Sequence, residues 1–275
     1  MGDQSGNFND NTGPDADGDV VHVVDPNNSQ SLGLLAKAYR DVYKPAFAPA
    51  DREAMEDWVD TLNGNNDFCN MSIVLLGEGL NTAKPTMKGI SVGYYYRDQD
   101  AALLGYTIVS PKYDAPGLEQ AMMDTITEAL QDISKKNGGQ MQAIFMETLN
   151  PAKVDNDDDR NDAVERLKML QSLGAKLVNI NFVEPPVCEG GDPNADLHLI
   201  AYPGKAGFQP STQQVKDVVT GLYTGQAENA GCAPNDNPDY LSVMKQIDAA
   251  SQLLVAPSSA SVAPVERKKV MRFNL

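Results

Sequence analysis

The sequence predicts a mixed α/β fold of the α+β type, with a mostly antiparallel sheet flanked by helices and a C-terminal helical extension. Hydrophobic residues make up 41% of the 275-residue chain, which is enough for a sizeable core. Extended segments alternate with segments of helical periodicity, and three extended segments follow one another between residues 71 and 109. Such a run predicts an antiparallel meander with helices packed around it.

The first third of the chain predicts one strand and two helices. The strand covers residues 20–24, and Ser29 or Ser31 can cap the helix that follows it. Apolar residues recur at helical spacing in this helix until Pro45, where we expect it to end. The second amphipathic helix begins near Asp51 and stops at Asn63 and Gly64.

The middle of the chain predicts the meander and two further helices. The predicted strands are 71–76, 89–96, 103–109, 142–148, 177–182 and 197–202. One helix runs from Gly117 to the Asn-Gly-Gly stop at 137–139, with an apolar face at helical spacing. The other follows an acidic loop at 155–159 and stops at Gly174.

The chain divides into four predicted parts. An acidic tail covers residues 1–19, a mixed α/β domain 20–203, a helical extension 204–255 and a flexible, locally basic tail 256–275. Two apolar stripes, one from Val215 to Leu222 and one from Leu241 to Leu254, predict the helices of the extension.

Charge and composition exclude several classes of function. The chain has 22 basic and 38 acidic residues, and its net charge of -16 argues against nucleic acid as a partner. His22 and His198 are the only histidines and the three cysteines are far apart, so we expect no metal site and reduced thiols. No apolar run is long enough for a membrane span, and residues 1–19 lack the features of a signal or transit peptide. We therefore expect a cytoplasmic protein without a membrane partner, with a secreted bacterial effector as the alternative.

Two segments resemble the GNAT-type N-acetyltransferase superfamily, in particular a bacterial branch of it. Gly89–Met122, GISVGYYYRDQDAALLGYTIVSPKYDAPGLEQAMM, is similar to its third and fourth strands, phosphate loop and third helix. Leu173–Pro203, LGAKLVNINFVEPPVCEGGDPNADLHLIAYP, resembles its last two strands. The resemblance covers about residues 20–203 and depends on the linear order of the elements more than on any short motif.

The resemblance implies an acyl-CoA-dependent N-acetyltransferase with acetyl-CoA as co-substrate and no metal. In this superfamily the fourth and fifth strands splay apart around pantetheine, and the pyrophosphate lies at the start of the following helix, where unpaired N–H groups favour an anion. The implied cofactor-binding residues are Thr107, Val109, Lys112, Ala115, Gly117, Leu118 and Asn150. The phosphate loop departs from the R/Q-x-x-G-x-G/A pattern, because Asp114 and Glu119 place two carboxylates where they would repel a pyrophosphate.

The same resemblance suggests catalytic residues. Glu147 is the candidate base, because its strand would end beside the splayed gap. The superfamily's usual acid is a Tyr four residues before the closing Gly of the next helix, where this chain has Leu170. Tyr202 and Tyr106 are the candidate substitutes.

Two functions remain open from the sequence. The first is transfer of an acetyl group to the amine of a small molecule or protein, and the acidic balance favours a cationic acceptor such as a polyamine, an aminoglycoside or a Lys-bearing protein. The second is a catalytically silent protein of the same fold that binds a ligand or acts as an effector, which the atypical loop and Leu170 favour.

Overall fold

The structure, a computed structural model, contains one eight-stranded sheet. It describes residues 18–47, 49, 52–113, 115, 117–141, 144–186, 190–203 and 209–257, so most of both predicted tails, as well as Asp114 and Cys188, lie outside the described residues. The strands are β1 (Asp19–Val23), β2 (Cys69–Glu78), β3 (Thr86–Tyr96), β4 (Ala101–Val109), β5 (Ile144–Leu149), β6 (Lys176–Val178), β7 (Leu197–Tyr202) and β8 (Leu254–Val255).

The sheet is mostly antiparallel, as predicted. Its strand order is β1-β2-β3-β4-β5-β7-β6-β8, and β4 and β5 form its parallel pair. β1 to β4 pair in chain order, with short connections from β2 to β3 and from β3 to β4, whereas the β1–β2 connection contains helices and α4 (Leu118–Lys136) connects β4 to β5. The predicted strands 103–109 and 142–148 are therefore neighbours, and the predicted fold class is confirmed.

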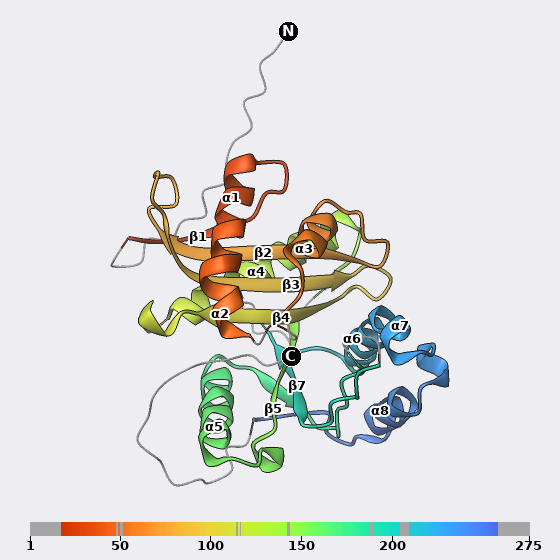
Figure 1. Ribbon diagram of the computed structural model, residues 1–275. Helices are drawn as coiled ribbons and strands as arrows, with labels where there is room; N and C mark the ends of the chain where they lie inside the picture. Colours follow the sequence, from red (N-terminus) through yellow and green to blue (C-terminus); the bar gives the residue numbers. More distant parts are fainter. Residues whose placement is uncertain are drawn as a thin grey trace.

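Helices cover both faces of the sheet (Figure 1). One face packs against α1 (Ser29–Ala38), α2 (Lys44–Ala46) and α3 (Met55–Leu62) at its N-terminal half, and against α6 (Thr212–Gly225) and α8 (Pro238–Ala249) at its C-terminal half. The opposite face packs against α4 and α5 (Asp157–Ser172). In Figure 1, β5 and β7 run at a steep angle to β4, so the two halves of the sheet point in different directions.

The first helix continues past Pro45, contrary to the prediction. The segment from Tyr39 to Tyr43 is a π-helix, in which the N–H of Lys44 donates to the carbonyl of Tyr39. Pro45 then lies in α2, and because the residues before it are already helical, its missing N–H removes one hydrogen bond from a continuous helical path at the wide π turn. The widened turn thus lets the helical path run to Ala46.

Two predicted elements near the C-terminal half are also different. The strand predicted over 177–182 ends at Val178, because the N–H groups of Asn179 and Asn181 donate to Leu253 and to the Gln246 side chain instead of to β7. Leu254, predicted to lie on a helix, belongs to β8, which pairs with β6. Both differences arise from long-range contacts with the C-terminal segment.

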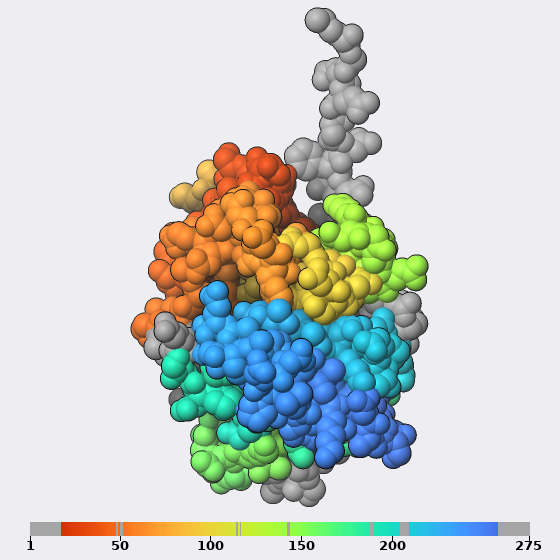
Figure 2. Space-filling model, turned by 90° about the vertical axis from the view of Figure 1, so that its right-hand side faces the viewer, coloured from red at the N-terminus to blue at the C-terminus, as the bar shows by residue number. Residues whose placement is uncertain are grey.

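The helices after residue 209 contribute to the main core. Val215, Val218 and Val219 of α6 and Val243 of α8 are fully buried in one hydrophobic cluster with residues of β4, β5 and β7. In Figure 2 these helices, in blue, directly adjoin the N-terminal half in orange and yellow. Two short elements, α7 (Ala227–Ala230) and a 3-10 turn at Pro234–Asp236, connect α6 to α8. No helix within the described ranges combines the length and apolarity needed to cross a membrane.

Candidate functional site

β4 and β5 diverge in the middle of the sheet. They pair between Ala102–Leu104 and Ile144–Met146, after which each strand continues for several residues without the other. The β3–β4 register shifts here, since Val92 opposes Tyr106 and Gly93 opposes Leu104, which leaves Gly105 as an extra residue. Such a bulge bends its strand and ends regular pairing. The two strands therefore open toward their carboxyl ends.

The backbone of Thr107 and Val109 faces this opening. The N–H of Ser110 donates to the carbonyl of Lys88 at 2.8 Å. Since hydrogen-bonded and non-bonded pairs alternate in an antiparallel ladder, Ile108 bonds to β3 and the polar backbone groups of Thr107 and Val109 point away from it. They can pair with an extended, amide-containing ligand lying between the strands.

The first turn of α4 begins close to the end of β4. Leu118 is buried with Leu76 and Met122, and Val109 packs against the same cluster. Gly117, in the left-handed conformation at φ 91°, precedes the helix and supplies no side-chain cap. The first-turn N–H groups and the positive end of the helix dipole thus favour an anion here. Ala115, just before Gly117, is exposed.

The carboxylate of Glu119 is neutralised by an ion pair. Arg166 of α5 donates from Nη2 to Glu119 Oε1 at 2.9 Å, and both side chains are largely buried. Burial lowers the pKa of Arg166, and the neighbouring Glu119 opposes that effect. The repulsion that the sequence predicts at this turn is therefore reduced by a residue 47 positions away.

Tyr113 lies in the segment between β4 and α4, and the ammonium groups of two lysines lie near its ring. Lys112 Nζ lies 5.0 Å and Lys88 Nζ 5.3 Å from the ring centre. Lys88 also forms ion pairs with Asp19 and Glu78 at 2.6 and 3.2 Å. Lys112 is exposed, so its ammonium group is accessible to an anionic ligand.

Glu147 lies on β5 just beyond the last residue that pairs with β4. Its side chain is 5% exposed, and apart from the neighbouring carboxyl group of Glu184 no hydrogen-bond donor among the described residues reaches its carboxyl oxygens. Burial, and then the neighbouring carboxyl group of Glu184, raise its pKa well above the usual value. A carboxyl group of this kind can hold or accept a proton near neutral pH.

Glu184 was not identified from the sequence. It lies in the long β6–β7 loop, where its backbone pairs with Asn194, and its side chain is 2% exposed. Burial raises its pKa to about 7, although hydrogen bonds with Glu147 and Asn194 act in the opposite direction. An acidic residue directly before Pro185 and Pro186 in an otherwise apolar run is the signal that could have identified it.

A second acidic centre, Glu53, was also missed. Tyr94 and Tyr106 donate to its two carboxyl oxygens, each at 2.7 Å, and Trp58 Nε1 donates as well. Burial, followed by the charge of Glu53, raises the pKa of both tyrosines, which keeps their hydroxyl groups protonated. The Tyr94 ring lies over the bulge, because a Cβ on Gly105 would be 2.8 Å from Tyr94 Cε2.

Tyr202 and Asn150 lie apart from Glu147. The Tyr202 hydroxyl donates to Asp124 Oδ1 at 2.5 Å in the core cluster beneath α4 and α5, which is the opposite face of the sheet. Asn150 accepts a hydrogen bond from the N–H of Ala152 at 3.0 Å, at the end of β5. Within the described residues, no cluster of three or more His, Cys, Asp or Glu could hold a metal ion.

No family model and no curated protein matches the chain. Several solved structures do match the chain. The ribosomal-protein-S18-alanine N-acetyltransferase from Escherichia coli is 14% identical, with a TM-score of 0.38 over 70% of this chain and 99% of that one. An acetyltransferase from Thermus thermophilus is 14% identical, with a TM-score of 0.37 over 67% and 96%. The diaminobutyrate acetyltransferase EctA from Paenibacillus lautus, in complex with L-2,4-diaminobutyric acid and coenzyme A, is 12% identical, with a TM-score of 0.40 over 70% and 98%.

Proposed function

We propose that this protein is a GNAT-type N-acetyltransferase that transfers the acetyl group of acetyl-CoA to an amine. The observation that carries this proposal is the parallel β4–β5 pair, which opens after a bulge and is followed by a helix N-terminus with a neutralised first-turn carboxylate. The pantetheine amides would pair with the backbone of Thr107 and Val109. The pyrophosphate would lie at the first turn of α4, with Lys112 as a counter-charge.

The acidic groups beside the opening suit acyl transfer. The amine nitrogen attacks the thioester carbonyl carbon, the C–S bond breaks, and the CoA thiolate leaves and takes a proton. Glu147 would accept the proton that the acceptor ammonium must lose before attack. Tyr106, on the diverging part of β4, is better placed than Tyr202 to return a proton to the thiolate, because Tyr202 lies on the other face.

Calorimetric titration of the full chain with acetyl-CoA tests the proposal. We expect saturable binding in the micromolar range and weaker binding by Gly117→Val, because valine is strained at φ 91° and crowds the backbone at the anion site. Gly138→Val is the matched control, since Gly138 has φ 80° at the other end of α4. Absence of binding at millimolar acetyl-CoA would contradict the proposal.

One observation favours the alternative, a catalytically silent protein. Leu170, in the position where the superfamily usually has a Tyr, is fully buried in the core cluster beneath α4 and α5. A silent protein would release no CoA in the presence of amines, whether or not it binds acetyl-CoA. Measuring free thiol release with a panel of primary amines distinguishes the two.

A further inference from the structure

We propose that the amine acceptor is an organic dication, a linear diamine or polyamine, with one ammonium group at Glu147 and Glu184 and a second at Asp239. This inference rests on the proposed function, and it names the substrate class from two separate acidic positions near the ring of Tyr223.

The first acidic position is the buried carboxyl pair. Glu147 comes from β5 and Glu184 from the β6–β7 loop, and both side chains are at least nine-tenths buried. The two groups are close enough to share a proton. Otherwise no donor of the described residues reaches Oε1 or Oε2 of Glu147 or Oε1 of Glu184.

Such a pair is costly for the folded protein. A buried polar group without a hydrogen-bond partner destabilises a protein, and more so if the group is charged. The pair therefore points to a ligand that supplies both donors and positive charge. A primary ammonium group, with three N–H donors, supplies both.

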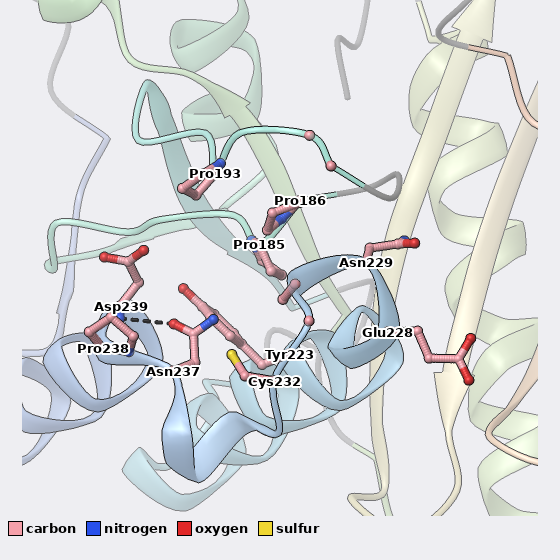
Figure 3. A pocket seen from close by; sticks show the side chains of 14 residues that line it. Pro185, Pro186, Pro193, Tyr223, Glu228, Asn229, Cys232, Asn237, Pro238 and Asp239 are labelled. Carbon is pink, nitrogen blue, oxygen red and sulfur yellow. Dashed lines mark hydrogen bonds between the residues drawn. The ribbon is translucent and has the colours of Figure 1, made fainter.

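The second acidic position belongs to a pocket that begins at the residue after Glu184. This pocket, of about 570 Å³, is lined by Pro185 and Pro186 of the loop and by residues from α6 to α8 (Figure 3). Asp239 and Glu228 are its charged residues, and none of the residues that line it is Lys, Arg or His. Its potential is therefore negative, which favours a cation.

Tyr223 belongs to the pocket and also contacts the loop that carries Glu184. It lines the pocket, and its hydroxyl donates to the carbonyl of Val183 at 2.6 Å, immediately before Glu184. The pKa of this tyrosine is raised by burial and then by the charges of Asp239, Glu147 and Glu184. All three carboxyl groups thus act electrostatically on the Tyr223 hydroxyl, and Asp239 lines the same pocket as Tyr223. Figure 3 shows that the Glu228 carboxylate, in contrast, points away from Tyr223.

The proton balance of the reaction follows from this placement. The ammonium at the carboxyl pair gives one proton to Glu147 or Glu184, and the lone pair of its nitrogen then attacks the thioester carbonyl carbon. As the C–N bond forms and the C–S bond breaks, the nitrogen loses a second proton and the leaving CoA thiolate takes up one proton. The second ammonium, at Asp239, keeps its proton and remains a binding group.

Binding of amines to the full chain without CoA tests this inference independently of acetyl transfer. The probes are butylamine, 1,3-diaminopropane, 1,4-diaminobutane and spermidine, titrated by calorimetry at matched ionic strength. We expect at least one of the diamines or spermidine to bind ten-fold or more tightly than butylamine. Asp239→Asn should remove most of that difference and leave butylamine binding unchanged, whereas Glu184→Gln should weaken all four.

Glu228→Gln is the matched control, because Glu228 lines the same pocket but its carboxylate points away from Tyr223. It should retain the preference for dications. Equal affinity of the native chain for butylamine and for every dication would overturn the inference, and that comparison requires no variant to fold. A preference that survives Asp239→Asn would also overturn it. The proposed function is tested by a separate measurement of acetyl-CoA binding, and its outcome does not depend on the result of the amine titrations.

Discussion

The effect of the Glu119 carboxylate on an anion at the start of α4 depends on its ion pair with Arg166. Alone, a carboxylate in the first turn of α4 stabilises the helix dipole and repels a phosphate. Paired with a guanidinium at 2.9 Å, it becomes part of a neutral, largely buried unit that fixes α5 against α4. Glu147 likewise depends on Glu184, whose buried carboxyl group shifts its proton affinity. At the scale of single residues, the candidate site therefore depends on two pairs of side chains, Glu119 with Arg166 and Glu147 with Glu184.

Removing Arg166 should damage both folding and cofactor binding. Arg166→Met leaves Glu119 uncompensated, and breaking a buried pair in this way typically costs about 3–5 kcal/mol. We expect a lower free energy of unfolding in urea and at least ten-fold weaker acetyl-CoA binding. The double variant Arg166→Met/Glu119→Gln should recover much of both. Arg160→Met, on the same helix but paired with the exposed Asp157, should change stability by about 1 kcal/mol or less.

Replacing Glu147 should affect catalysis more than cofactor binding. Glu147→Gln removes the proposed base while keeping its volume, so we expect kcat to fall by about 10²- to 10⁴-fold and acetyl-CoA affinity to change little. Stopped assays of CoA release together with calorimetry measure both quantities. A variant with native kcat would assign the base elsewhere, for instance to Glu53.

The buried carboxyl pair should make stability depend on pH. A carboxyl group whose pKa is raised on folding stabilises the protein fully below its unfolded pKa, and this contribution is lost as pH rises through the folded pKa, about 7 for Glu184. The Tm should therefore decline between about pH 5 and 7. Glu184→Gln should flatten this decline relative to Glu228→Gln, as measured by scanning calorimetry. An unchanged slope would show that the pair is not titrating.

At the scale of elements, close packing of α4 on β3 and β4 fixes the opening. Gly89 of β3 touches this helix, since a Cβ there would be 2.8 Å from Met122 Sδ and 2.9 Å from the carbonyl oxygen of Ile108. The helix N-terminus can lie beside the end of β4 only if this position lacks a side chain. The glycine and the bulge at Gly105 therefore act together on the geometry of the proposed anion site.

Gly89→Ala should disturb this contact. Overpacking of a well-packed site typically costs about 1–3 kcal/mol, and displacement of the first turn of α4 should also weaken acetyl-CoA binding. Gly33→Ala in α1 is the control, because no atom lies within 4 Å of a Cβ there and alanine favours the helix by roughly 1 kcal/mol. Urea denaturation should thus show shifts of opposite sign, and a stabilised Gly89→Ala would contradict the packing argument.

At the scale of the whole molecule, the C-terminal helices complete the core. α6 and α8 bury Val215, Val218, Val219, Leu222 and Val243 against the face of the sheet that carries Glu147. They also hold Tyr223, whose hydroxyl bonds to the β6–β7 loop. One set of contacts therefore supports both the fold and the pocket.

A chain that ends at residue 208 should not fold stably. Its sheet would expose an apolar face now covered by α6 and α8, and burial of each such large side chain contributes about 1.5–3 kcal/mol. We expect strong binding of a hydrophobic dye and no cooperative thermal transition. A cooperatively folded truncated chain would show that residues 20–203 form an independent domain.

The sequence by itself determined most elements of this protein and their order. Helical spacing with Gly stops located α4 and α5, and alternation with turn residues located β2, β3, β4 and β7, because these signals are local. That β4 and β5 are neighbours, and the candidate site residues on them, were proposed from the resemblance. Only the tertiary structure brought Arg166 to Glu119, Glu184 to Glu147 and Tyr106 to Glu53, and it turned the predicted helical extension into part of the core. The physical reason is that the sequence around a charged residue or an apolar face does not indicate which distant residues it will contact. The residues of the three pairs named above are 37 to 53 positions apart.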